Sequence, residues 1–166
     1  NNILDSTITG ASTGVQAHSG TSLSVERSTL SSDGSGLRIE PGASAIANSS
    51  VFQLVGRSSY APAGAVTLTN LPGSNSSAEL TTSTMIGYGR SSVPAINMAN
   101  GTNRTIDVTL RNSVISGWSS SVTRTATAPS VSNITTINSA YAPFADSANG
   151  IRSETGRLEA TDLGLL

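Results

Sequence analysis

The stretch ILDSTITGASTGVQAHSG (residues 3–20) decides the fold, because VERSTLSSDGSGLRIEPG (residues 25–42) matches it without a gap at an offset of 22 residues. Apolar residues fall on apolar residues and glycine falls on glycine in the pairs Ile3 and Val25, Ile8 and Leu30, Val15 and Leu37, and Gly20 and Gly42. A fixed period of this length is typical of repeat architectures, in which each repeat folds as one unit and stacks on its neighbours.

The first half of the repeat can be followed along the whole chain. An apolar anchor recurs at Ile8, Leu30, Val51, Met85, Ile115, Tyr141 and Leu165. Five positions earlier stand Ile3, Val25, Ile46, Leu80, Leu110, Thr136 and Ala160. Three positions before the anchor, at a bend, stand Asp5, Arg27, Asn48, Thr82, Asn112, Asn138 and Asp162. Serine stands two positions before most anchors, and we expect a structural polar ladder of hydrogen bonds along Ser6, Ser28, Ser49, Ser83, Ser113 and Ser139.

The second half of the repeat is a short alternating segment that ends in glycine or proline. It is found at GVQAHSG (14–20), GLRIEPG (36–42), AVTLTNLPG (65–73), AINMANG (95–101), GIRSETG (150–156) and, more weakly, SVTRTATAP (121–129). Alternation with period two places Val15 and Ala17 on one face of a strand. Glycine and proline at the ends predict turns. No segment has an apolar stripe of helical period, so we expect no helix.

Strands this short cannot bury an apolar face alone, but a repeat of about 22 residues can wrap once around a narrow core, with the next repeat about 4.8 Å above it. The sequence therefore predicts an all-β fold, a single-stranded parallel β-helix of about seven coils. We expect one domain over residues 1–166, as a segment of a longer solenoid that meets adjacent coils or other copies at its ends. Insertions are expected in loops near 52–64, 86–94, 116–121 and 142–149. The alternative is an antiparallel sandwich with Asn-Gly hairpins at 100–101 and 149–150.

Composition narrows the range of partners. The net charge is −1 and the nine basic residues, all Arg, are scattered, which argues against nucleic acid and against anionic membranes. The chain has no Cys and therefore no disulfide or thiolate site. No apolar run approaches 18 residues, so we expect no membrane insertion of this segment.

Residues 3–30 and GLRIEPGASAIANSSV (36–51) resemble the passenger domain of pertactin-type autotransporters, which alternates similar phrases. The resemblance is specific over about a third of the chain, residues 3–51. It implies a right-handed β-helix that is secreted through the periplasm to the outer surface of a Gram-negative bacterium. It also implies a role in adhesion or host contact, with virulence, and a host surface protein or glycan as partner.

Few residues suggest chemistry. His18 points outward beside Glu40 of the next coil, as either a lateral contact or an acid–base pair. The ten acidic residues are dispersed, with Glu154 in the column of Glu40 but four coils away, so we expect no catalytic carboxylate cluster and no enzyme. With a single His we also expect no metal site and no cofactor.

Exposed aromatic side chains are the usual means by which a β-helix holds sugar rings. The possible ligand-facing aromatics are Trp118, Tyr60 and Tyr88, although Trp118 also suits a role in packing the core. Our first hypothesis is a non-enzymatic, surface-displayed stalk or adhesin. The alternative is a carbohydrate-binding or carbohydrate-processing β-helix of phage tail-spike or polysaccharide-lyase type.

Overall fold

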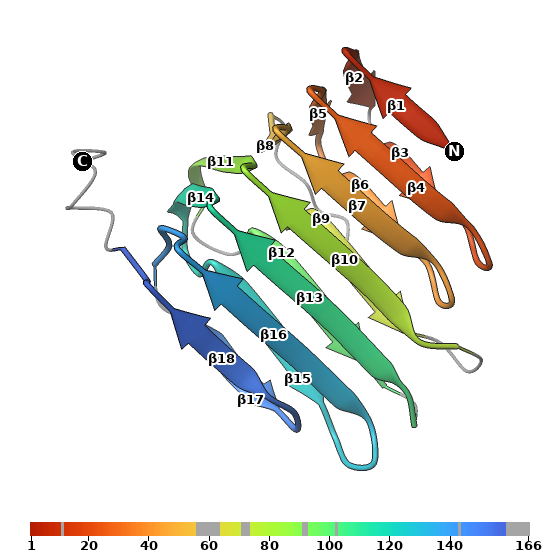
Figure 1. Cartoon of the computed structure of the whole chain (residues 1–166), viewed down its shortest axis with the longest axis vertical. Coiled ribbons are helices and arrows are strands. Elements are labelled where there is room, and N and C mark those ends of the chain that lie inside the picture. The colour runs from red at the N-terminus through yellow and green to blue at the C-terminus, as the bar shows by residue number, and fades with distance from the viewer. Residues whose placement is uncertain are drawn as a thin grey trace.

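The computed structural model consists of parallel strands wound into a solenoid with three sheets (Figure 1). It describes residues 1–10, 12–55, 64–70, 74–90, 93–101, 103–142 and 144–158. In that part of the chain every regular element is a strand, and every strand pairing is parallel. The same residues contain no helix long and apolar enough to cross a bilayer.

Each complete turn of the solenoid contributes one strand to each sheet. The first sheet contains β1 (Asn2–Leu4), β4 (Ser22–Glu26), β7 (Ser44–Asn48), β10 (Ser76–Thr81), β13 (Thr105–Arg111), β16 (Val131–Ile137) and β18 (Arg152–Thr155). The second contains β2 (Thr7–Gly10), β5 (Thr29–Ser32), β8 (Val51–Leu54), β11 (Thr84–Arg90) and β14 (Val114–Trp118). The third contains β3 (Thr13–Ala17), β6 (Ser35–Ile39), β9 (Gly64–Asn70), β12 (Ile96–Asn100), β15 (Val122–Ala126) and β17 (Ala145–Ala148).

The predicted parallel β-helix is therefore confirmed, with about five complete turns rather than seven. After β15 the chain forms β16, then only an isolated bridge at Ala140 in place of a second-sheet strand, then β17 and β18. The predicted seventh anchor, Leu165, lies outside the described residues, as do Ala160 and Asp162 of the neighbouring columns.

The corner between the first and second sheets has the same form after β1, β4, β7, β10, β13 and β16. One residue takes a left-handed conformation with φ between 46° and 51°, and a serine follows it, at Asp5, Arg27, Ser49, Thr82, Asn112 and Asn138. Asn and Asp adopt this region more readily than most residues, which accounts for Asp5, Asn112 and Asn138 in the predicted bend column, but Asn48 was wrongly placed there because it belongs to β7 and Ser49 is the corner residue. Because this corner never lengthens, all extra residues lie at the other two corners.

The sequence alignment was wrong by one residue in the third turn. Leu30 pairs with Phe52 rather than Val51, and Val25 pairs with Ala47 rather than Ile46. Phe52 and Ala47 are fully buried, whereas Ile46 is 48% exposed. A shift of one residue moves every side chain of a strand to the opposite face, and adjacent apolar residues at both positions hide such a shift from the hydrophobic pattern.

The loop predictions were only partly right. Residues 52–54, 86–90, 116–118 and 145–148 were expected in or near loops and are strand instead. The third turn gains its extra length at two corners, 55–63 and 71–75, and not in one loop. Segment 150–156 was assigned to the wrong half of the repeat, because β18 pairs with β16 in the first sheet.

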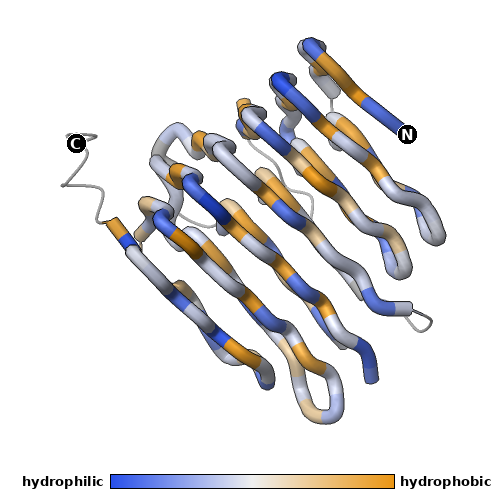
Figure 2. The backbone as a smooth tube through the Cα atoms, in the orientation of Figure 1, coloured by the Kyte–Doolittle hydropathy of each residue, from blue (hydrophilic) through white to orange (hydrophobic). Residues whose placement is uncertain are grey.

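The core lies between the three sheets and is built from files of equivalent side chains. Along the strands the hydropathy alternates (Figure 2), and the buried apolar residues form a single core cluster. One file runs in register from Ala17 through Ile39, Leu68 and Met98 and then reaches Arg124. Burial of each large aliphatic side chain contributes about 1.5–3 kcal/mol, so the aliphatic files stabilise the first turns. At Arg124 this file becomes charged, so the aliphatic file does not account for the stability of the last turns.

Candidate functional site

The predicted serine ladder lies at the corner between the first and second sheets. Each serine hydroxyl donates to the carbonyl two residues before it, as Ser113 Oγ does to Arg111 O at 2.7 Å. It also accepts the backbone N–H of the serine in the preceding turn, as Ser113 Oγ does from Ser83 N at 3.0 Å. The same N–H to Oγ bond joins Ser6 to Ser28, Ser28 to Ser50, and Ser113 to Ser139. The left-handed corner leaves these groups outside the sheet ladders, and the serines satisfy them.

Ser49 was wrongly placed in this ladder. It is the left-handed corner residue of its turn, with φ of 51°, and Ser50 provides the hydroxyl that accepts the Ser28 N–H at 3.2 Å. This is the same one-residue shift that places Phe52 in the core. The ladder is buried for most of its length and serves the backbone, so it has a structural role.

Trp118 was proposed as a ligand-facing residue, and the structure contradicts this. The side chain is only 9% exposed and belongs to the core cluster. It fills the space beside Gly87, where an added Cβ would lie 2.6 Å from Trp118 Cδ2. A ring in this position has no free face for a sugar.

Tyr88 remains on the surface, with 66% of the residue exposed. Its hydroxyl donates to Gln53 Oε1 on the neighbouring strand of the second sheet at 3.1 Å. Tyr60, the third candidate aromatic residue, lies outside the described residues.

His18 and Glu40 are neighbours on the outside of the third sheet, as expected. His18 Nδ1 lies 3.2 Å from Glu40 Oε2, and Glu40 also accepts bonds from Ser19 N at 3.2 Å and from Gln16 Nε2. These bonds, that of Ser19 foremost, lower the pKa of Glu40. A general acid at neutral pH needs a raised carboxyl pKa, whereas that of Glu40 is lowered. Glu40 and its partners therefore have the features of a surface contact that joins two turns.

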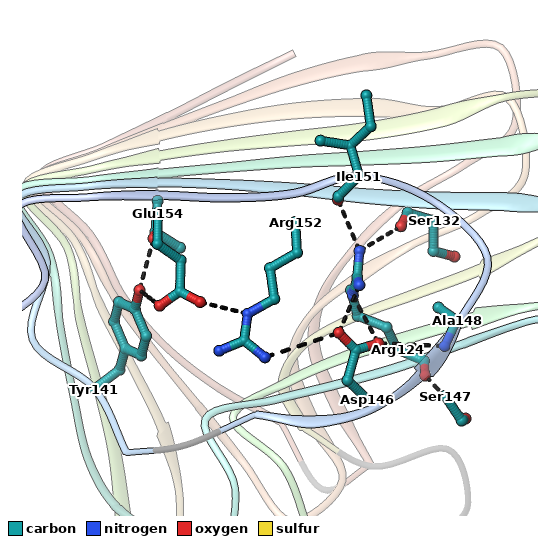
Figure 3. A network of polar contacts seen from close by, with 10 residues as sticks. Arg124, Ser132, Tyr141, Asp146, Ser147, Ala148, Ile151, Arg152 and Glu154 are labelled. Atoms are coloured by element: carbon teal, nitrogen blue, oxygen red, sulfur yellow. Dashed lines mark hydrogen bonds and ion pairs between the residues drawn. The ribbon is translucent and has the colours of Figure 1, made fainter.

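A second network of polar contacts, which the sequence did not predict, lies at the end of the core in the last turns (Figure 3). Arg124 is 2% exposed and donates to both carboxylate oxygens of Asp146, at 3.2 and 2.6 Å. Its remaining terminal nitrogen donates to Ser132 O at 2.7 Å and Ile151 O at 2.8 Å. The guanidinium thus ties β15, β16, β17 and the start of β18 together with strong charge-assisted bonds.

Beside this pair lies an aromatic and charged layer. Tyr141 is fully buried; its hydroxyl donates to Glu154 Oε2 at 2.6 Å and lies 2.7 Å from Thr136 Oγ1. Arg152 bonds Glu154 and stacks over the Phe144 ring at 4.2 Å, and Phe144 stacks on Tyr141 with centroids 5.0 Å apart. Arg152 also lies 3.9 Å from Asp146, which joins the two halves of the network (Figure 3). We call these residues the closing network: Arg124, Tyr141, Phe144, Asp146, Arg152 and Glu154.

The electrostatics of the closing network favour charged carboxylates. Burial raises the pKa of Asp146, but hydrogen bonds from Arg124 and the positive charges nearby outweigh it, and the pKa is lowered. The same holds for Glu154, where Tyr141 and Arg152 outweigh burial. Burial, with the hydrogen bond to Glu154, raises the pKa of Tyr141 to about 12. The network is therefore fully formed at neutral pH.

Register explains why sequence reasoning missed this site. Asp146 pairs with Arg124, and Arg152 and Glu154 pair with Ile134 and Thr136, so all occupy inward positions. The sequence signal was an Arg at the aliphatic position of 121–129 and an Asp 22 residues later, one repeat length away. Among the described residues, no group of three or more His, Cys, Asp or Glu side chains is arranged to hold a metal ion.

A scan against models of protein families found no match, and searches of curated proteins and of solved structures also found none.

Proposed function

We propose that this chain is a non-enzymatic adhesin or stalk module that is exported through the periplasm and displayed on the outer surface of a bacterium. In this proposal it acts in the manner of pertactin-like autotransporter passengers and contacts a host surface protein or glycan. The repeated phrase over residues 3–51 and the parallel solenoid support this proposal.

One observation carries the proposal: the described carboxylates with lowered pKa values all form contacts between turns. Asp5, Glu40, Asp146 and Glu154 each have a lowered pKa and a hydrogen-bonded partner in an adjacent turn. Catalytic acids and bases are tuned toward the working pH instead. These side chains join successive turns of the solenoid, which suits a stalk or display role.

The outer face of the first sheet offers a surface for such contact. Its strands lie side by side along the length of the molecule (Figure 1), and in register they present uncharged polar side chains over most turns. One outward file reads Asn2, Ser24, Ile46, Glu79, Thr109, Thr135 and Ser153. Hydroxyl and amide groups bind polar partners without the desolvation of full charges.

The test is binding of the intact chain to arrays of glycans and extracellular-matrix proteins and to cultured epithelial cells. We expect saturable binding to at least one of these surfaces, lost when the same chain is heat-unfolded. Equal signals from the folded and unfolded chain on every surface would reject the adhesive role. Turnover of an arrayed glycan by the folded chain would reject the non-enzymatic assignment.

A further inference from the structure

Tyr88 has a backbone conformation that most side chains avoid. Its φ is 46°, in the left-handed region where a bulky aromatic residue is an outlier. The pairing of β11 with β14 shifts register between Ile86 and Arg90, which marks a β-bulge around Tyr88. A bulge re-aims the side chain that it carries, and bulges are frequent beside binding sites. Unlike the left-handed corner residues, Tyr88 lies within a strand and is not required by the repeat.

The ring of Tyr88 lies along the outer surface of the second sheet. Ile86 pairs with Gln53 of β8, and the Tyr88 hydroxyl reaches Gln53 Oε1 at 3.1 Å, so the side chain crosses from one strand to the next (β11 and β8 in Figure 1). With 66% of the residue exposed, most of the Tyr88 side chain is open to solvent. The hydrogen bond restricts the ring before any ligand arrives, which reduces the entropy lost on binding.

Packing of the core does not explain this side chain. Trp118 already fills the interior beside Gly87, directly before Tyr88 in the sequence. Gln53 Oε1 is occupied by the Tyr88 hydroxyl, and the Gln53 amide nitrogen has no hydrogen bond to any described residue. An exposed aromatic ring thus lies next to an available hydrogen-bond donor.

We propose that Tyr88 and Gln53 bind a pyranose ring of a neutral glycan. The apolar face of the sugar stacks on Tyr88, and a sugar hydroxyl accepts a hydrogen bond from the Gln53 amide. The Tyr88 hydroxyl and the Gln53 amide are both uncharged, which favours a neutral sugar over an acidic one. The inference rests on the proposed adhesive role, because it names one contact point and one ligand class for it.

The probes are cellohexaose, maltohexaose, mannohexaose and chitohexaose, titrated into the isotope-labelled chain. We expect at least one of them to shift the Tyr88 ring and Gln53 side-chain amide signals in NMR spectra in a saturable way. Tyr88→Ala should weaken that affinity about tenfold, the magnitude of one lost stacking contact. Gln53→Ala and Tyr88→Phe should each weaken it less, since the first keeps the ring and the second keeps the ring and the amide donor.

Ile151→Ala is the matched control, because Ile151 is also 66% exposed but directly precedes β18 of the first sheet and is in neither the Tyr88 site nor the outward file. Its affinity should equal that of the unchanged chain, and the thermal unfolding of every variant shows whether the fold is retained. The proposal is overturned if none of the four probes shifts Tyr88 and Gln53, or if a shifting probe binds Tyr88→Ala with unchanged affinity. Array binding that survives in Tyr88→Ala would reject this site while leaving the adhesive role in place, and absence of all array binding would reject both.

Discussion

Arg124 has its charge at a position that four earlier turns fill with Ala17, Ile39, Leu68 and Met98. Its guanidinium is satisfied only because Asp146 and two carbonyls surround it. Removal of one partner of a buried ion pair is far more harmful than its replacement by two apolar groups. The residue therefore stabilises the last turns only as part of a pair.

We predict that Arg124→Met destabilises the chain by about 2–4 kcal/mol, below the range for fully buried pairs because the Asp146 side chain is 23% exposed to screening solvent. The double variant Arg124→Met with Asp146→Leu should recover most of the loss. Urea unfolding at neutral pH measures both. Arg27→Met, which removes an exposed pair with Asp5, is the control and should leave the midpoint unchanged. A midpoint for Arg124→Met equal to that of the parent would contradict the assignment.

A single serine of the ladder is also testable. Ser113→Ala removes the acceptor of the Ser83 N–H, and both residues are 1% exposed. An unsatisfied buried donor destabilises by about 1–3 kcal/mol. Ser24→Ala, on the outer face of the first sheet, should change the unfolding midpoint little. If both substitutions had equal effects, the ladder would not be a stabilising element.

Among the strands, the third turn allows a test of register. Phe52 is fully buried, whereas Val51 points outward beside Thr84. Phe52→Ala should destabilise by about 3–5 kcal/mol and Val51→Ala by less than about 1 kcal/mol, both measured by thermal unfolding. The reverse order would restore the register inferred from the sequence alone.

The last strands should respond to pH. Asp146 and Glu154 have lowered pKa values, so their contribution is present above about pH 4 and is lost as the pH falls below it. The pKa of Tyr141 is raised to about 12, so its contribution is complete below about pH 10 and is lost as the pH rises through 12. Amide NMR signals of β17 and β18 should change in acid before those of β4 and β5. Simultaneous loss of all four strands in acid would contradict local opening.

The raised pKa of Tyr141 can be measured directly. The chain has three tyrosines, so Tyr60→Phe with Tyr88→Phe leaves Tyr141 as the only phenol. Its phenolate absorbance should then appear with a midpoint near 12, and Glu154→Gln should lower that midpoint by removing a negative neighbour. A midpoint near 10, the ordinary value for tyrosine, would mean that the ring is not held in the closing network.

The strand pairings show which parts of the structure could be predicted from the sequence. Identical spacing in the first two turns predicted the stacking of Ile8 on Leu30, because only one register fits a gapless repeat. The third turn was ambiguous, since Ser49-Ser50 and Val51-Phe52 fit either of two registers. In the last turns the inward positions became charged, so Asp146 and Glu154 read as surface residues and the hydrophobic pattern gave no signal. The sequence predicted that Tyr88 is an exposed aromatic residue. Its bulge and its hydrogen bond to Gln53 depend on packing between turns, which the sequence does not show.

At the scale of the whole molecule, the structure is a stack in which each turn contacts mainly its neighbours. Seven strands in the first sheet, at about 4.8 Å spacing, extend over about 29 Å. In such a stack stability is close to a sum over turns and their interfaces. The aliphatic files therefore stabilise the early turns and the closing network stabilises the late ones. A substitution in one set has little effect on the stability of the turns that the other set holds.

The central claim is that equivalent residues of successive turns lie side by side on parallel strands, and disulfide pairing tests it most directly. The chain has no Cys, and Ser24 pairs with Ile46 on the outer face of the first sheet. Neighbours on adjacent strands are close enough for a disulfide. We predict that the double variant Ser24→Cys with Ile46→Cys forms an intramolecular disulfide completely under mild oxidation. The double variant Ser24→Cys with Ala47→Cys should not, because residue 47 faces the core. Pairing of the second variant but not the first would contradict the stacked solenoid.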